Sequence, residues 1–215
     1  MSRSIAAGRQ AVKIARCATL VLAATAAAAC SRSDTPLSPH GFIGAELTTP
    51  VPKPGFVFTD SRGHPFRLDS ATAGKVTLVF FGYTHCPDVC PIHMANLAAV
   101  LDKMPEEIQR QVTVVFITTD PQRDSLPVLN AWVHGFSPDF IGLTAPDSIV
   151  AASERMLELP PIEKSAVDSA GNYTVGHSAV VVAFTRDGLG RVEYPNGTRQ
   201  RDWAHDLPLL VAWGS

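Results

Sequence analysis

The sequence lacks a basic stripe, a glycine-rich phosphate loop and internal repeats. Its formal net charge is −2, and residues 1–29 carry four basic residues and no acidic ones, so the chain without that segment carries −6. An acidic protein without a basic stripe is a poor nucleic-acid binder. We therefore expect no nucleic-acid partner.

Long apolar runs are missing as well. The apolar run near the start, Ala18–Ala29, is interrupted only by two threonines and is about 12 residues long, whereas a membrane-spanning helix needs roughly 20. Four basic residues precede it, a pattern typical of an export signal. We interpret residues 1–29 as a lipoprotein signal peptide that is not part of the fold.

Cysteine is scarce, with four residues in the chain. Cys17 lies in the predicted signal peptide. Cys30 follows Ala27-Ala28-Ala29, which resembles a bacterial lipobox, after which Cys30 would be the lipidated first residue; cleavage to a soluble exported product is the alternative. Residues 30–51 are rich in Ser, Thr and Pro, which indicates a flexible tether. The prediction is an exported, membrane-anchored lipoprotein, on the outer face of a bacterial cytoplasmic membrane or in the periplasm.

The two remaining cysteines, Cys86 and Cys90, lie between an apolar run at 76–81 and a helical pattern at 92–101. Cysteines four residues apart lie about one helical turn from each other, so they can form a disulfide or bind one metal ion. A structural disulfide of this span would stabilise the fold little. If Pro91 is the first helical residue, Cys90 is the N-cap and the helix dipole favours thiolate. The pair is predicted to be redox-active, metal-binding or both.

Strand and helix patterns alternate along the rest of the chain. Residues 56–60 and 65–68 predict an N-terminal β-hairpin. Further strands are expected at 75–81, 112–117, 140–143, 173–184 and 191–194, and helices at 92–101, 128–136, 146–157 and 202–213. This order predicts an α/β fold over residues 52–215: a thioredoxin-like sandwich whose central mixed sheet is flanked by helices, with the N-terminal hairpin as an extension.

In such a fold, the cysteine loop, the loop at Asp120 and the segment at His177 meet at one edge of the sheet, where ligands of open α/β sheets bind. Two thiolates and an imidazole suit Cu(I), and suit Zn(II) less well. His177 lies in an apolar run, where an unpaired ring would be costly. From the residues alone, a metal ligand and a core histidine with a satisfied partner explain His177 equally well.

The neighbouring polar residues have simpler interpretations. Asp120 is a candidate supporting residue, although a strand-end turn in which Asp124 caps the next helix explains both acids almost as well. His85 flanks Cys86; it either tunes the pKa of Cys86 or is solvated, and a role as a metal ligand is the less favoured alternative. His93, in the first helical turn, is expected at the surface.

Three motifs together resemble those of the Sco/SenC family, in the same order and at similar spacing. They are Phe81-Gly82-Tyr83-Thr84-His85-Cys86-Pro87-Asp88-Val89-Cys90-Pro91, Asp120-Pro121-Gln122-Arg123-Asp124 and Gly176-His177-Ser178-Ala179. The resemblance implies a thioredoxin-fold protein that binds copper, as Cu(I) with Cu(II) as a second state, through Cys86, Cys90 and His177. Many family members have a transmembrane anchor in place of a lipobox, and Gln122 replaces the usual Glu.

The resemblance also implies a function. Family members deliver copper to the dinuclear copper centre of cytochrome c oxidase or reduce its cysteines. The expected partners are therefore the copper-bearing subunit of the oxidase, other copper chaperones or thiol reductants, and the membrane through the lipid anchor. The alternative is an enzyme, a thiol–disulfide oxidoreductase in which Cys86 and Cys90 act as the redox pair; three residues separate the cysteines here, where thioredoxin-like reductases have two.

Overall fold

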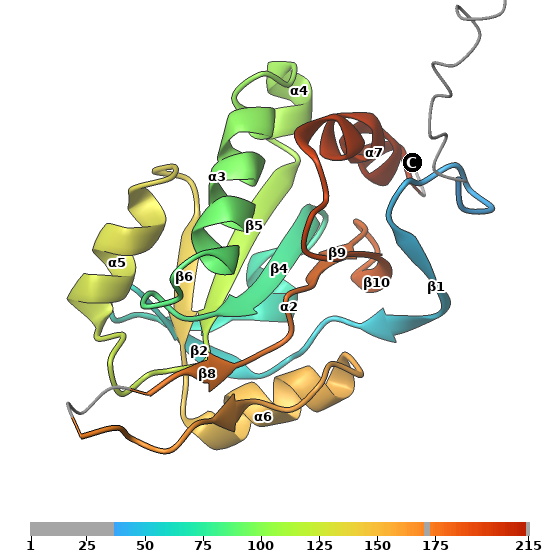
Figure 1. Ribbon diagram of the computed structural model, residues 1–215. Helices are drawn as coiled ribbons and strands as arrows, with labels where there is room; N and C mark the ends of the chain where they lie inside the picture. The colour runs from blue at the N-terminus through green and yellow to red at the C-terminus, as the bar shows by residue number, and fades with distance from the viewer. Residues whose placement is uncertain (1–36, 170–172, 214–215) are drawn as a thin grey trace, which may run out of the picture. The chain divides into compact units, whose positions relative to one another are not determined.

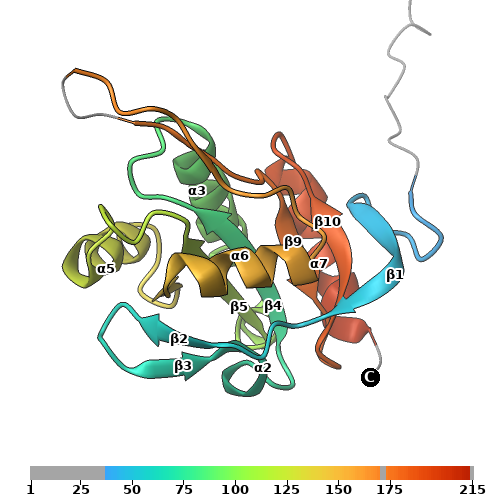
Figure 2. The ribbon, with the colours of Figure 1, turned by 90° about the horizontal axis from the view of Figure 1, so that it is seen from below.

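The computed structural model describes residues 37–169 and 173–213. These residues form an eight-stranded mixed sheet with helices on both faces (Figures 1 and 2). The strand order is β1–β10–β9–β4–β5–β6–β2–β3, and β7 and β8 form a separate two-stranded ribbon. The architecture confirms the predicted α/β sandwich with a central mixed sheet.

The element bounds are as follows. The strands are β1 Ala45–Pro52, β2 Val57–Asp60, β3 Pro65–Arg67, β4 Val76–Gly82, β5 Val112–Thr118, β6 Ile141–Thr144, β7 Glu163–Lys164, β8 Val175–Gly176, β9 Val181–Phe184 and β10 Leu189–Tyr194. The helices are α2 Leu68–Ala71, α3 Val89–Leu101, α4 Glu106–Gln109, α5 Leu126–His134, α6 Asp147–Met156 and α7 Gln200–Ala212.

Strands β4, β5 and β6 form the parallel centre of the sheet, and β9 pairs antiparallel with β4. Every residue of β4 is buried. Successive side chains of a strand point to opposite faces, so a strand covered on both faces is apolar throughout. This is why the predictions for β4 and β5 were close to the observed bounds.

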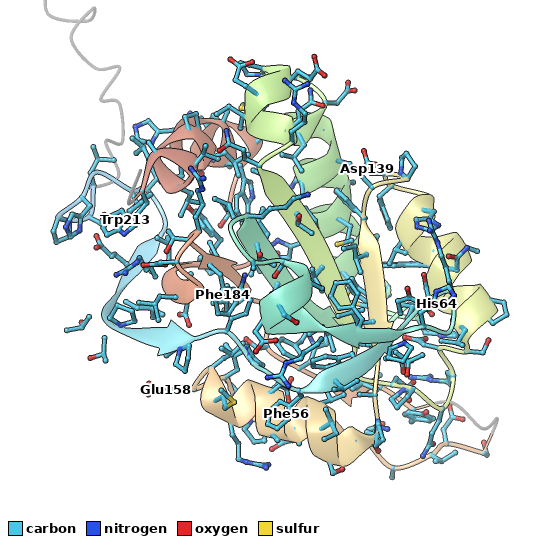
Figure 3. The ribbon with its side chains drawn as sticks, turned by 180° about the vertical axis from the view of Figure 1, so that it is seen from behind. Phe56, His64, Asp139, Glu158, Phe184 and Trp213 are labelled. Carbon is cyan, nitrogen blue, oxygen red and sulfur yellow. The ribbon has the colours of Figure 1, made fainter. Side chains whose placement is uncertain are left out.

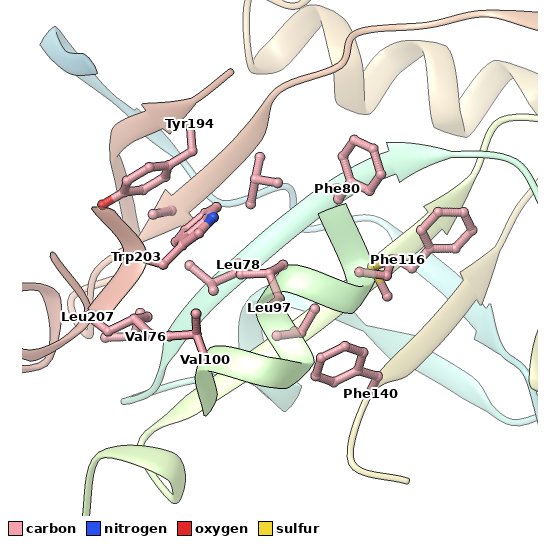
Figure 4. Close-up of a cluster of buried hydrophobic side chains, with 14 of the residues drawn as sticks. Val76, Leu78, Phe80, Leu97, Val100, Phe116, Phe140, Tyr194, Trp203 and Leu207 are labelled. Atoms are coloured by element: carbon pink, nitrogen blue, oxygen red, sulfur yellow. The ribbon is translucent and has the colours of Figure 1, made fainter. Parts of the chain in front are cut away.

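Two apolar clusters fill the space on the two faces of the sheet. On one face, side chains such as Leu78 and Phe80 pack against α3, α5 and α7, with Trp203 of α7 fully buried (Figure 4). On the other face, Val79 and Phe81 pack in a cluster that includes Val150 of α6. The carboxyl ends of β4 and β5 are therefore held rigidly between two layers.

The predicted tether differs from the structure near its end. Residues Ala45–Pro52 form β1, which pairs antiparallel with β10, and Phe42 is 1% exposed in the first cluster. The carboxylate of Asp206 accepts hydrogen bonds from the backbone N–H groups of Ile43 and Gly44. A fold that starts at residue 52 is therefore wrong, because the segment before it supplies a strand and part of the core.

The long strand predicted at 173–184 is also wrong. Its first part, β8, pairs with β7 in the separate ribbon, and its second part, β9, pairs with β4 and β10. Residues 177–180 lie between them and belong to neither sheet. His177 is thus carried by a connection, not by a strand of the main sheet.

No helix in the described part of the chain is long and apolar enough to span a membrane. The predicted signal peptide and Cys30 lie outside the described residues.

Glu154 of α6 is a buried carboxyl group with an unusual environment. It is 1% exposed, and neither carboxylate oxygen has a hydrogen-bond partner among the described residues. Burial raises its pKa from 4.5 to about 7. Because the folded state holds the proton more tightly than the unfolded chain, stability is full below about pH 4.5 and falls as the pH rises toward 7.

We therefore expect Glu154→Gln to raise the free energy of unfolding at pH 8 by about 2 kcal/mol and to change it little near pH 4.5. Urea unfolding at both pH values measures this difference. Glu107→Gln, at an exposed glutamate of α4, is the matched control and should have little effect at either pH. An equal effect of Glu154→Gln at both pH values would show that its proton affinity is not the cause.

Candidate metal centre

The loop between β4 and α3 carries Cys86 and Cys90. It follows Gly82, the last residue of β4. If any other residue replaced Gly82, its Cβ atom would lie 2.8 Å from the Cys90 sulfur and 2.8 Å from the Phe116 ring. Only glycine allows this close approach of the strand end to the helix. The Thr119 N–H donates a hydrogen bond of 2.7 Å to the Gly82 carbonyl, which joins the cysteine loop to the end of β5.

Helix α3 begins at Val89, one residue after Asp88, whose side chain accepts a hydrogen bond from the Val89 N–H. The N-cap is thus Asp88, and the prediction of Cys90 at this position is wrong. Cys90 is the second helical residue and is fully buried, and burial raises the pKa of its thiol well above the usual range. The predicted stabilisation of a Cys90 thiolate by the helix is also wrong, because desolvation outweighs it.

His177 faces the cysteines from the connection between β8 and β9. Its Nε2 lies 3.4 Å from the Cys90 Sγ, and its Nδ1 lies 2.8 Å from the Ser178 carbonyl oxygen. A carbonyl only accepts, so Nδ1 carries the proton and Nε2 presents its lone pair to the sulfur. The rings of Tyr83 and Phe80 pack edge-on to His177, with centroids 5.7 and 5.9 Å away. Burial lowers the pKa of His177, which favours the neutral ring that binds metals.

The structure brings these three residues together. One ligand atom from each of Cys86, Cys90 and His177 lies within 4.8 Å of the others. Both cysteines are free thiols; Cys90 is buried, whereas Cys86 and His177 are half-buried, so solvent reaches the cluster at these two residues. Two sulfurs and an imidazole nitrogen form a soft, low-coordinate donor set of the kind that Cu(I) prefers.

Asp120 is fully buried and belongs to a separate polar group. The Tyr173 hydroxyl donates a hydrogen bond of 2.7 Å to it, the Arg123 Nε donates another, and the Lys164 Nζ lies 3.5 Å away. The Arg123 guanidinium stacks on the Tyr173 ring at 3.7 Å and donates to the Tyr173 carbonyl. These contacts lower the pKa of Asp120 against the opposing effect of burial. Asp120 thus holds the ribbon that leads to His177; Arg123 and Tyr173, its partners, were not predicted.

Asp124 has a different role from the predicted helix cap. Its carboxylate accepts hydrogen bonds from the Thr84 N–H at 2.9 Å, the Thr84 hydroxyl at 2.6 Å and the Thr118 hydroxyl at 2.5 Å. Helix α5 starts after Ser125 without a side-chain cap. Asp124 therefore fixes the cysteine loop to the end of β5.

The two histidines beside the cysteines, His85 and His93, differ in how far they are exposed to solvent. The His85 side chain is 50% exposed and pairs with Asp124. His93, expected at the surface, is 2% exposed, packs against Phe80 and bonds to the backbone of Ala179, and its Nε2 has no partner among the described residues. His93 lies three residues after Cys90 and four before Leu97, and residues at these spacings share one face of a helix. Because Cys90 and Leu97 are both buried, this spacing could have placed His93 on the inner face of α3.

This chain is similar to known proteins both in sequence and in structure. The chain is 40% identical over 111 residues to the mitochondrial SCO1 homolog 1 of Arabidopsis thaliana, a match that covers 50% of this chain and 32% of that protein. The chain thus spans about a third of that relative's length.

Two solved structures have the same fold. The solution structure of apo Sco1 from Thermus thermophilus is 31% identical, with a TM-score of 0.71, and the match covers 81% of this chain and 99% of that one. The structure of Bradyrhizobium japonicum ScoI with copper bound is 29% identical, with a TM-score of 0.64, and covers 76% and 98%. Residues 46–212 match the SCO1/SenC family, which is most of the described chain. This chain belongs to the SCO1/SenC family.

Proposed function

We propose that this protein is a copper metallochaperone that binds Cu(I) through Cys86, Cys90 and His177. The observation that carries the proposal is the meeting of two free thiols and one neutral imidazole nitrogen within 4.8 Å, on segments 87 residues apart in sequence. A related structure, ScoI of Bradyrhizobium japonicum, was solved with copper bound.

The burial pattern suits a site that both holds and releases an ion. The Cys90 thiol is costly to ionise where it lies, so its proton leaves when the metal takes its place. Cys86 and His177 are half-buried, so an acceptor thiolate can reach the ion beside them and enter the coordination shell. The protein's ligands then leave one at a time, and no electron is transferred.

The acceptor that fits this chemistry is the dinuclear copper centre of cytochrome c oxidase, on its copper-bearing subunit. Other copper chaperones would supply the ion, and thiol reductants would keep the pair reduced. Lipidation at Cys30 would hold the protein on the outer face of a bacterial membrane, so that donor, chaperone and acceptor share one surface.

A thiol–disulfide oxidoreductase is the second candidate. The observation that favours it is the pair itself: the Cys90 N–H lies 3.4 Å from the Cys86 sulfur, and both thiols are free. Cys86, the more exposed thiol, would attack a partner disulfide and Cys90 would resolve the mixed disulfide. The raised pKa of Cys90 makes it a slow resolving thiol.

Copper stoichiometry and affinity on the reduced full-length protein in detergent test the proposal. We expect one Cu(I) per chain, and we expect His177→Ala to weaken Cu(I) binding on the order of ten- to a hundredfold while abolishing Cu(II) binding, because two thiolates alone still satisfy Cu(I). Competition with a Cu(I) chelator measures the affinity.

His64→Ala is the control, since this histidine is 73% exposed and lies in the β2–β3 turn (Figure 3). An unchanged Cu(I) affinity in His177→Ala would contradict the three-ligand site. Rapid reduction of insulin disulfides by a wild-type protein that retains no copper would favour the oxidoreductase instead.

A further inference from the structure

His85 is next in sequence to Cys86, the half-buried cysteine of the copper site. It is 50% exposed. The cluster of atoms within 4.8 Å contains Cys86, Cys90 and His177 but not His85, so its ring lies outside the three-ligand site. Its contacts nevertheless resemble those of a metal ligand.

The hydrogen bonds around His85 fix its tautomer. Its Nδ1 lies 3.1 Å from the Thr84 hydroxyl oxygen and 3.4 Å from the Asp124 Oδ1. The single hydroxyl proton of Thr84 is already donated to Asp124, over 2.6 Å. Both neighbours of Nδ1 can therefore only accept, so Nδ1 carries the proton and the neutral ring has its lone pair on Nε2.

This arrangement has the form of a histidine prepared to bind a metal. Ligating histidines usually donate their other ring N–H to a carboxylate or carbonyl, which fixes the tautomer and raises the basicity of the ligating nitrogen. His177 has its Nδ1 bonded to the Ser178 carbonyl in the same way. The described chain thus holds two histidines with a fixed Nδ1–H, one inside the site and one next to Cys86 in sequence.

We propose that His85 is a transient entry ligand for Cu(I), which receives the ion through Nε2 before it passes to Cys86, Cys90 and His177. The proposal rests on the proposed copper function. The Nε2 lone pair replaces a ligand of the copper donor, which leaves with its own electron pair. As each Cu–S bond forms, Cys86 and Cys90 release their thiol protons to water, and copper stays Cu(I) throughout.

A transient ligand changes the rates of Cu(I) loading and release, and it does not change the equilibrium affinity for Cu(I). The final site does not contain His85, so its loss leaves the affinity unchanged, and both loading and release must slow by the same factor. Mutations at one interface change association rates by about one to three decades, so we expect loading about tenfold slower in His85→Gln.

The experiment is stopped-flow transfer of Cu(I) from a bicinchoninate complex to the reduced full-length protein, and back to excess chelator, with the equilibrium affinity measured on the same samples. We expect His85→Gln to slow both directions equally. Thr84→Val, which removes the hydroxyl that orients the ring, should slow them less.

His64→Gln is the matched control, because the His64 Nδ1 lies 3.5 Å from a carboxylate oxygen of Asp60 and its ring is exposed, but no cysteine flanks it. It should load at the wild-type rate. Wild-type loading and release in His85→Gln would overturn the proposal, and so would an affinity loss equal to the loss in loading rate, which would make His85 a permanent ligand. A wild-type protein that binds no Cu(I) would instead overturn the copper function itself, and this inference with it.

Discussion

Replacing Cys90 with alanine should lower the Cu(I) affinity on the order of a hundred- to a thousandfold, the largest loss that we expect from a single change. Structural zinc sites with four ligands contribute about 10–16 kcal/mol, or roughly 2.5–4 kcal/mol for each ligand, and every 1.4 kcal/mol is a factor of ten. Cys86→Ala should have a similar effect. Both should exceed the effect of His177→Ala, since the thiolates are the softer ligands and neutralise the charge of the ion.

The measurement is chelator competition on the reduced proteins, together with urea unfolding without copper. The Cys90 side chain is fully buried in the apolar cluster, so Cys90→Ala also removes packing and should lower the free energy of unfolding by about 1 kcal/mol. Copper should raise the unfolding midpoint of the wild type but not of Cys90→Ala. Retention of tight binding in Cys90→Ala would show that copper binds elsewhere.

The sequence was most informative where local pattern and environment agree. Strand β4 is apolar at nearly every position because both of its faces are covered, and the cysteines follow it at the junction with α3. The elements around the site could therefore be predicted from periodicity and spacing alone. Its apolar surroundings favoured His177 among the seven histidines, but the choice between a metal ligand and a core histidine needed the family resemblance.

The errors occurred where distant partners decide the structure. The Thr-rich and Pro-containing segment of β1 has the composition of a tether, and it becomes a strand only because the edge of β10 is open to it. Residues 173–184 are rich in apolar residues, yet their strand partners change between Gly176 and Val181. Local patterns do not record which strand will be the neighbour.

The polar network around the site was hidden for the same reason. A helix cap is the ordinary role of an aspartate before a helix, and nothing local shows that Asp124 reaches Thr84, 40 residues earlier. The thiol pKa of Cys90 likewise depends on burial by distant segments. The sequence thus predicted the three residues that meet in the candidate metal centre, whereas the contacts that position them became visible only in the folded chain.

Asp124→Ala should be among the most destabilising single changes near the site. The Asp124 side chain is fully buried and accepts three hydrogen bonds, two from Thr84 and one from Thr118. Hydrogen bonds to charged groups contribute about 1.5–3 kcal/mol each, and buried donors left unpaired add to the loss. The hydroxyl groups can find other partners, so we expect the free energy of unfolding to fall by about 3 kcal/mol.

The same change should weaken copper binding about tenfold, because the loop that carries Cys86 loses its link to β5. This outcome separates Asp124 from His85, whose loss should slow loading without changing affinity. Urea unfolding and chelator competition on Asp124→Ala, Asp124→Asn and the exposed control Asp139→Ala measure both effects. Asp124→Asn should lie between wild type and Asp124→Ala, since one amide oxygen still accepts. A loss below about 1 kcal/mol in Asp124→Ala, within the range of ordinary substitutions, would mean that the cysteine loop is held by its backbone bonds alone and that the carboxylate is dispensable.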